Sequence, residues 1–96
     1  WFSVPSPLKL CLDQWSAWLR VPGLDFKSRM AGKRLWVVAT SGDRAKAQPM
    51  LDSCRLCAEF MGMEWKGALW GKGGAPDTVL TDQAALAAAE AYFAPI

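Results

Sequence analysis

Apolar side chains recur at helical spacing in the N-terminal part of the chain. Ser6 is a suitable N-cap, and Pro7 suits the first helical turn because its missing N–H would have no partner there anyway. The segment Val21-Pro22-Gly23 ends the pattern. The sequence therefore predicts a helix between Pro7 and Val21. Its apolar stripe consists of Leu8, Cys11, Leu12, Trp15, Trp18 and Leu19.

Two short apolar runs predict strands. Residues 35–39 form the continuous run Leu-Trp-Val-Val-Ala, which is β-branched and aromatic. A strand exposed on one face would alternate, so this run predicts a strand buried on both faces, as in a parallel sheet. Residues 65–70 form a shorter and weaker candidate, interrupted by Gly67. Residues 24–33 are mixed in character and predict a loop.

Two further helices are expected in the second half of the chain. Pro49 fits a first helical turn and Gly62 fits a left-handed C-terminal cap. The apolar stripe between them consists of Met50, Leu51, Cys54, Cys57, Ala58 and Met61. After a glycine-rich loop at 71–76, an alanine-rich helix is predicted from residue 81 or 82 to Ala94. Its inward-facing residues are predicted to be Leu86, Ala89 and Phe93.

The order of these elements is helix, strand, helix, strand, helix. Such alternation predicts an α/β fold with a parallel sheet. Two strands are too few to cover both edges of residues 35–39, and unpaired N–H and C=O groups along an edge need a further strand. We therefore expect strands that this chain lacks, on its N-terminal side.

Composition excludes several classes of function. The chain has 96 residues, of which 52% are apolar, so a packed core is feasible. Its net charge of +2 is small and scattered, which does not indicate nucleic-acid binding. The absence of histidine excludes Ser-His-Asp and Cys-His catalysis and imidazole zinc sites. No apolar run reaches the ~18 residues of a membrane span, so no membrane partner is expected.

The three cysteines are too few for an all-thiolate metal cage, and no metal is expected. Their low, odd number is untypical of a secreted disulfide scaffold, so a reducing cytoplasm is the expected location. Cys54 and Cys57 have CxxC spacing, but such a redox pair acts from a helix N-terminus. The predicted helix puts both on its apolar stripe, which favours buried packing. Cys11 is likewise expected in a core stripe.

The first nine residues, Trp-Phe-Ser-Val-Pro-Ser-Pro-Leu-Lys, followed by Leu12-Asp13, carry a recognisable motif. It resembles the segment that follows the third strand and opens the third helix in flavodoxin-like NAD(P)H-dependent FMN reductases. Residues 32–43 look like the fourth strand of that family and the flavin-contacting loop after it. Residues 61–65 and 73–77 resemble its fifth strand and the loop before its last helix.

This resemblance implies a flavodoxin-like three-layer α/β sandwich with a parallel sheet. Residues 1–96 would be its C-terminal half, without the N-terminal strands and the phosphate-binding loop. Neither G-x-x-x-x-G-K-[ST] nor G-x-G-x-x-G occurs in the sequence to replace that loop. Lys72-Gly73-Gly74 follows a strand but no helix follows at once, which disfavours a phosphate-binding role. The chain alone is therefore expected to bind FMN weakly or not at all.

The implied activity is transfer of a hydride from NADH or NADPH to bound FMN and on to a small acceptor such as a quinone or free flavin. FMN is the implied cofactor and NAD(P)H the co-substrate, with no catalytic side chain required. Open α/β sheets bind ligands at the carboxyl ends of their strands. The implied cofactor-binding residues are Trp1, Phe2, Ser3, Val4, Thr40, Ser41, Gly42 and Asp43.

Alternative interpretations remain open from the residues themselves. Trp1 and Phe2 could form a hydrophobic plug, and residues 40–43 could be an ordinary loop with Asp43 as a helix cap. The protein could be a flavodoxin-type electron carrier without nicotinamide chemistry, or a non-enzymatic half-domain that completes its sheet with a partner. Trp15 and Trp18 are a candidate dimer face, and a homo-oligomer (dimer or tetramer) is expected.

Overall fold

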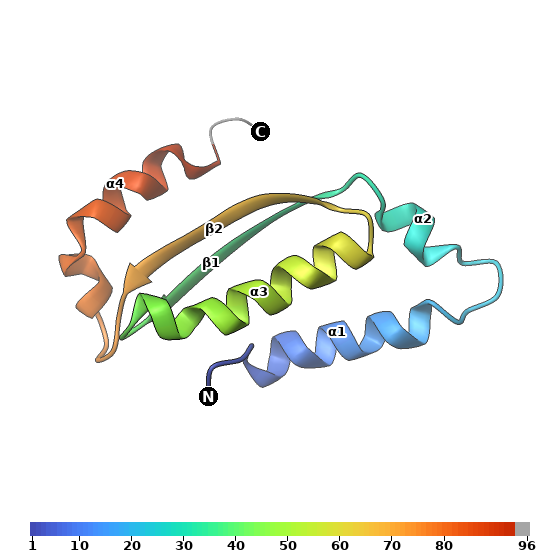
Figure 1. Cartoon of the computed structure of the whole chain (residues 1–96), viewed down its shortest axis with the longest axis horizontal. Coiled ribbons are helices and arrows are strands. Elements are labelled where there is room, and N and C mark those ends of the chain that lie inside the picture. Colours follow the sequence, from blue (N-terminus) through green and yellow to red (C-terminus); the bar gives the residue numbers. More distant parts are fainter. Residues whose placement is uncertain (94–96) are drawn as a thin grey trace.

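The computed structural model describes residues 1–93, in which two parallel strands are joined by a helix (Figure 1). The elements are α1 (Ser6–Trp18), α2 (Phe26–Met30), β1 (Arg34–Ser41), α3 (Arg44–Phe60), β2 (Glu64–Lys72), the 3-10 helix η1 (Thr78–Thr81) and α4 (Gln83–Tyr92). The predicted α/β class and parallel pairing are confirmed. The prediction of a loop over residues 24–33 is wrong in part, because α2 lies within it.

The sheet consists of β1 and β2 paired in one register with a single irregularity. Leu35 pairs with Trp65 and Val37 with Ala68, so β2 carries one extra residue between these pairs. Gly67 lies in this bulge with φ of 112°, a conformation that side chains disfavour. The glycine that weakened the sequence-based prediction of this strand therefore allows the strand to continue.

α3 supplies the buried core of the described chain. α1 and α3 lie on one side of the sheet and α4 lies on the other (Figure 1). The buried apolar residues are Ala47, Leu51, Cys54, Ala58 and Met61. Four of them belong to the stripe that the sequence predicts, and Gly62 follows with the expected positive φ of 69°.

The prediction that Pro49 lies in the first turn of this helix is wrong. α3 begins at Arg44, and Pro49 lies inside it. The carboxylate of Asp43 accepts a hydrogen bond from the N–H of Ala45 at 2.9 Å and so caps the helix. An exposed aspartate at residue 43 therefore starts the helix at Arg44, five residues before Pro49.

The prediction that residues 35–39 are buried on both faces is wrong for the chain as it stands. No residue of β1 is fully buried, and Val38 is 60% exposed. The only strand paired with β1 within residues 1–93 is β2, so the other edge of β1 is unpaired. The apolar run at 35–39 thus predicts more burial of β1 than residues 1–93 provide.

The outer helices are also more exposed than expected. Within residues 1–93, α1 has no buried residue and Cys11 is exposed, which corrects its predicted place in a core stripe. The predicted N-cap Ser6 is instead the first helical residue, after Pro5. Leu86 and Ala89 are exposed, so the prediction that they face inward is wrong. Phe93 is 45% exposed, but its ring lies edge-on to Trp36 of β1 with centroids 5.6 Å apart, so it faces the sheet as predicted. Ala94 lies outside the described residues.

The two tryptophans of the candidate dimer face contact an aromatic residue of their own chain. The rings of Trp15 and Trp18 lie edge-on to Phe26, with centroids 6.0 and 5.4 Å away. The homo-oligomer therefore stays a prediction, which sedimentation measurements would test. Over residues 1–93, no helix has both the length and the apolar character that crossing a bilayer requires.

Candidate functional site

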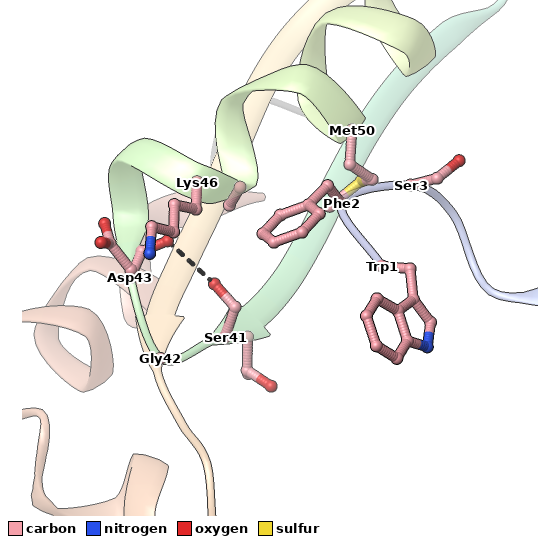
Figure 2. Close-up of a pocket in the computed structure, with 10 residues that line it drawn as sticks. Trp1, Phe2, Ser3, Ser41, Gly42, Asp43, Lys46 and Met50 are labelled. Atoms are coloured by element: carbon pink, nitrogen blue, oxygen red, sulfur yellow. Dashed lines mark hydrogen bonds between the residues drawn. The ribbon is translucent and has the colours of Figure 1, made fainter.

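A pocket of about 520 Å³ lies at the carboxyl end of β1, a size in the range of small-molecule sites. Three segments line it: the N-terminal segment, the end of β1 with the loop after it, and the first turns of α3 (Figure 2). Its lining residues are Trp1, Phe2, Ser3, Thr40, Ser41, Gly42, Asp43, Lys46, Ala47 and Met50. Segments nearly forty residues apart in the sequence therefore share one site.

All of the candidate cofactor-binding residues except Val4 line this pocket. Val4 instead lines a separate surface groove beside the first turns of α1, together with Pro7 and Leu10. The pocket lining from this segment therefore ends at Ser3. The sequence therefore identifies the right segment but includes one residue that the structure does not bring to the pocket.

The loop at residues 41–43 combines fixed and free polar groups. The carbonyl oxygen of Asp43 accepts from the Ala47 N–H at 3.2 Å, and the Asp43 carboxylate caps α3. Within residues 1–93, the main-chain N–H groups of Gly42 and Asp43 donate to no other group. They lie just before the N-terminus of a 17-residue helix, where the partial positive charge favours an electron-rich ligand atom.

Aromatic and thioether side chains form the apolar part of the pocket. The rings of Trp1 and Phe2 point in different directions from the N-terminal segment, and Phe2 lies near Met50 of α3 (Figure 2). Phe2 has φ of 61°, a left-handed conformation that is uncommon for an aromatic residue. Both rings are largely exposed in the described chain. They are therefore available to cover a flat ligand.

The pocket is also lined by three residues of α3 that the sequence pattern did not indicate: Lys46, Ala47 and Met50. With α3 beginning at Arg44, residues 46, 47 and 50 lie on the face of its first turns that borders the loop. Placing the helix start at Pro49 hides this arrangement. The alternative interpretation of Asp43 as a helix cap is confirmed, and it indicates the earlier helix start that brings these residues to the pocket.

Two main-chain donors of the glycine-rich loop after β2 are already hydrogen-bonded within the chain. The N–H of Lys72 donates to the carboxylate of Asp82 at 2.9 Å, and the N–H of Gly73 donates to the carbonyl of Ser41 at 2.8 Å. The hydrogen bonds from the N–H groups of Lys72 and Ala85 lower the pKa of Asp82. The bonds from Lys72 and Gly73 therefore hold the loop against the end of the sheet.

The CxxC pair lies in the middle of α3, far from its N-terminus. Cys54 is buried and its Sγ lies 3.9 Å from the Sδ of Met50. Burial, and secondarily the neighbouring Cys57, raises the pKa of the Cys54 thiol. The preferred interpretation of Cys54 as a packing residue is confirmed.

Comparisons with known proteins identify two relatives from Bacillus subtilis. The chain is 40% identical over 92 residues to the protein named "Putative NAD(P)H-dependent FMN-containing oxidoreductase YwqN" of strain 168. This alignment covers 93% of this chain and 51% of that protein. The solved structure of the Trp repressor binding protein from Bacillus subtilis matches with a TM-score of 0.87 and 38% identity. That match covers 97% of this chain and 62% of the other.

The chain thus spans about half the length of the curated relative that it matches. No family model matches the sequence. At these levels of identity and structural agreement, the parallel α/β arrangement of residues 1–93 corresponds to part of a flavodoxin-like chain. The chain is therefore a homologue of these two flavodoxin-like Bacillus proteins, covering about half of the first and 62% of the second.

Proposed function

We propose that this chain borders the isoalloxazine ring of FMN in an NAD(P)H-dependent oxidoreductase. The proposed reaction of the complete protein passes an electron pair from NADH or NADPH through FMN to a small acceptor, such as a quinone or free flavin. The observation that carries this proposal is the pocket in which the N-terminal aromatic residues meet the loop after β1. The relationship to a protein named as an FMN-containing oxidoreductase supports it.

The residues of the pocket fit an isoalloxazine ring. Such a ring needs an apolar wall for its flat faces and hydrogen-bond donors for its polar edge. Phe2 and Met50 offer the wall, and Trp1 lies across from them. The N–H groups of Gly42 and Asp43 offer the donors. Gly42 has no neighbouring heavy atom within 4 Å of the position of a Cβ, so a ligand can approach its main chain closely.

Lys46 adds a positive charge to the same pocket. A positive charge beside the polar edge of a flavin favours its reduced form, because that form carries more negative charge. The chemistry that FMN supplies when bound is acceptance of a hydride and its release to a second substrate. The proposed roles of this chain are to orient the ring and to adjust its potential, which require neither histidine nor another acid or base.

The unpaired edge of β1 suggests what the complete protein adds. An apolar groove of about 310 Å³ runs beside this edge, between α1 and α3. Its lining residues are Leu8, Leu12, Trp15, Leu35, Trp36, Val37, Val38, Cys54 and Cys57. We propose that a further strand of the complete protein pairs with β1 and fills this groove. The donors for the FMN phosphate are proposed to come from the same additional portion.

Titration of FMN distinguishes these proposals. The chain alone is expected to bind FMN weakly or not at all. A fusion of this chain with the portion of the Bacillus oxidoreductase that it does not cover is expected to bind one FMN. Adding NADH or NADPH without oxygen is then expected to bleach the flavin absorbance.

Each contrary result removes a different part of the proposal. Tight binding by the chain alone would contradict the need for additional strands. A fusion without FMN binding would overturn the cofactor assignment. Binding without bleaching by either nucleotide would favour an electron carrier.

Phe2→Ala in the fusion is expected to weaken FMN binding about tenfold. Phe60→Ala is the matched control, because Phe60 is similarly exposed but lies at the far end of α3.

A further inference from the structure

The hydroxyl of Ser41 has two hydrogen-bond partners within the chain. The indole N–H of Trp70 donates to Ser41 Oγ at 2.8 Å, and Ser41 Oγ donates to the carbonyl oxygen of Asp43 at 3.3 Å (Figure 2 shows the second bond). Trp70 belongs to β2 and does not line the pocket. Trp70 thus contacts Ser41 from β2, outside the pocket.

The directions of these two bonds follow from the chemistry of the groups. An indole N–H can only donate, so Ser41 Oγ accepts from Trp70. The single hydroxyl proton of Ser41 is then directed to the Asp43 carbonyl. This hydroxyl has no second proton with which to bind a ligand. Ser41 therefore contributes to the pocket by fixing the backbone rather than through its side-chain donor.

A third bond completes the attachment of the loop. The main-chain carbonyl of Ser41 accepts from the N–H of Gly73 at 2.8 Å. A Cβ on Gly73 would lie 3.1 Å from the Cβ of Thr40, so the backbone after β2 approaches the end of β1 closely here. The end of β1 is thus held on both its main chain and its side chain, while the adjacent N–H groups of Gly42 and Asp43 have no partner within residues 1–93.

We propose that Trp70 is a positioning residue for the flavin site. Its indole N–H orients Ser41 Oγ, which holds the Asp43 carbonyl and so directs the N–H groups of Gly42 and Asp43 toward the pocket. The ligand part of this inference rests on the proposed function. The positioning part concerns only the described residues and can be tested without a ligand.

The first test is NMR relaxation of the ligand-free 96-residue chain. Trp70→Phe removes the N–H but keeps an aromatic ring, and it is expected to lower the backbone order parameters of Gly42 and Asp43. Trp65→Phe is the matched control on the same strand, since Trp65 makes no side-chain hydrogen bond within residues 1–93. Unchanged order parameters in Trp70→Phe would overturn the positioning role.

The second test is a double-mutant cycle in the fusion protein, with the FMN dissociation constant as the readout. Trp70→Phe and Ser41→Ala are each expected to weaken binding about tenfold, and the double variant is expected to be no weaker than either. Equal effects of Trp65→Phe and Trp70→Phe, or additive effects in the cycle, would overturn the link to the ligand. Failure of the unmodified fusion to bind FMN would instead overturn the proposed function, while the relaxation data still decide the role of Trp70.

Discussion

The hydroxyl of Tyr92 lies 2.7 Å from the carbonyl oxygen of Gly67, the residue that forms the bulge in β2. The same hydroxyl lies 2.9 Å from the carbonyl oxygen of Val37 on β1. A phenol has one proton to donate, so the two carbonyls share a single donor. The last helix thus contacts both strands at the one place where their register is irregular.

Replacing Tyr92 with phenylalanine is expected to destabilise the chain. Both carbonyls lose their shared donor, which costs about 1 kcal/mol and corresponds to a decrease in Tm of about 4–8 °C for a domain of this size. Thermal unfolding followed by circular dichroism measures the change. Phe93→Leu is the control, because it keeps the Tyr92 hydroxyl. If Phe93→Leu lowers Tm as much as Tyr92→Phe does, the effect comes from general packing of α4 and not from the hydrogen bond.

Ionisation of Tyr92 is expected to limit stability at alkaline pH. Burial, the largest cause, raises the pKa of Tyr92 above its ordinary value of about 10. The stability from the neutral hydroxyl is therefore complete below about pH 10 and is lost as pH rises through the folded-state pKa. Because the chain has one tyrosine, its phenolate absorbance reports this group alone. A midpoint at or below that of a free tyrosine would contradict the prediction.

Asp82 is expected to make stability depend on acid pH. Its carboxylate accepts from the N–H groups of Lys72 and Ala85, and these bonds lower its pKa. The stabilisation is present above its unfolded-state pKa of about 3.9 and is lost as pH falls through the lower folded-state pKa. Asp82→Asn is expected to remove this part of the pH dependence of Tm. Asp77→Asn, at a residue without a side-chain hydrogen bond within residues 1–93, should retain it.

Gly71→Ala is expected to be the more damaging of two glycine substitutions. A Cβ at Gly71 would lie 2.7 Å from the Cγ2 of Val79, a stiff branched side chain, whereas a Cβ at Gly42 would meet nothing within 4 Å. Overpacking of this kind costs about 1–3 kcal/mol. Urea unfolding compares Gly71→Ala with Gly42→Ala. Adding Val79→Ala to Gly71→Ala should recover part of the loss, and no recovery would show that another contact is responsible.

The cysteines are expected to react with iodoacetamide in a fixed order. Cys11 is exposed and should react first, whereas Cys54 should react last because it is buried and its pKa is raised. Mass mapping of partly alkylated chain gives the order. Early modification of Cys54 together with Cys57 would indicate that the CxxC pair is accessible and would revive its redox interpretation.

Local pattern was sufficient for much of this molecule. The apolar stripe of Leu51, Cys54 and Ala58 predicts the buried face of α3, because helical spacing alone decides which side chains share a face. The continuous run at 35–39 predicts a strand, and polar residues after it predict a loop at its carboxyl end. The motif at Trp1 to Lys9 then indicates which distant segment meets that loop.

The sequence determined by itself the α/β class, the parallel pairing and most residues of the pocket, because these depend on periodicity and on short motifs. Only the tertiary structure decided which faces are covered, since exposure depends on neighbours that periodicity does not specify. Cys11 and Val38 have apolar neighbours in sequence but are exposed in space. The bond from Trp70 to Ser41 likewise joins residues 29 positions apart, a proximity that arises when the two strands align in register.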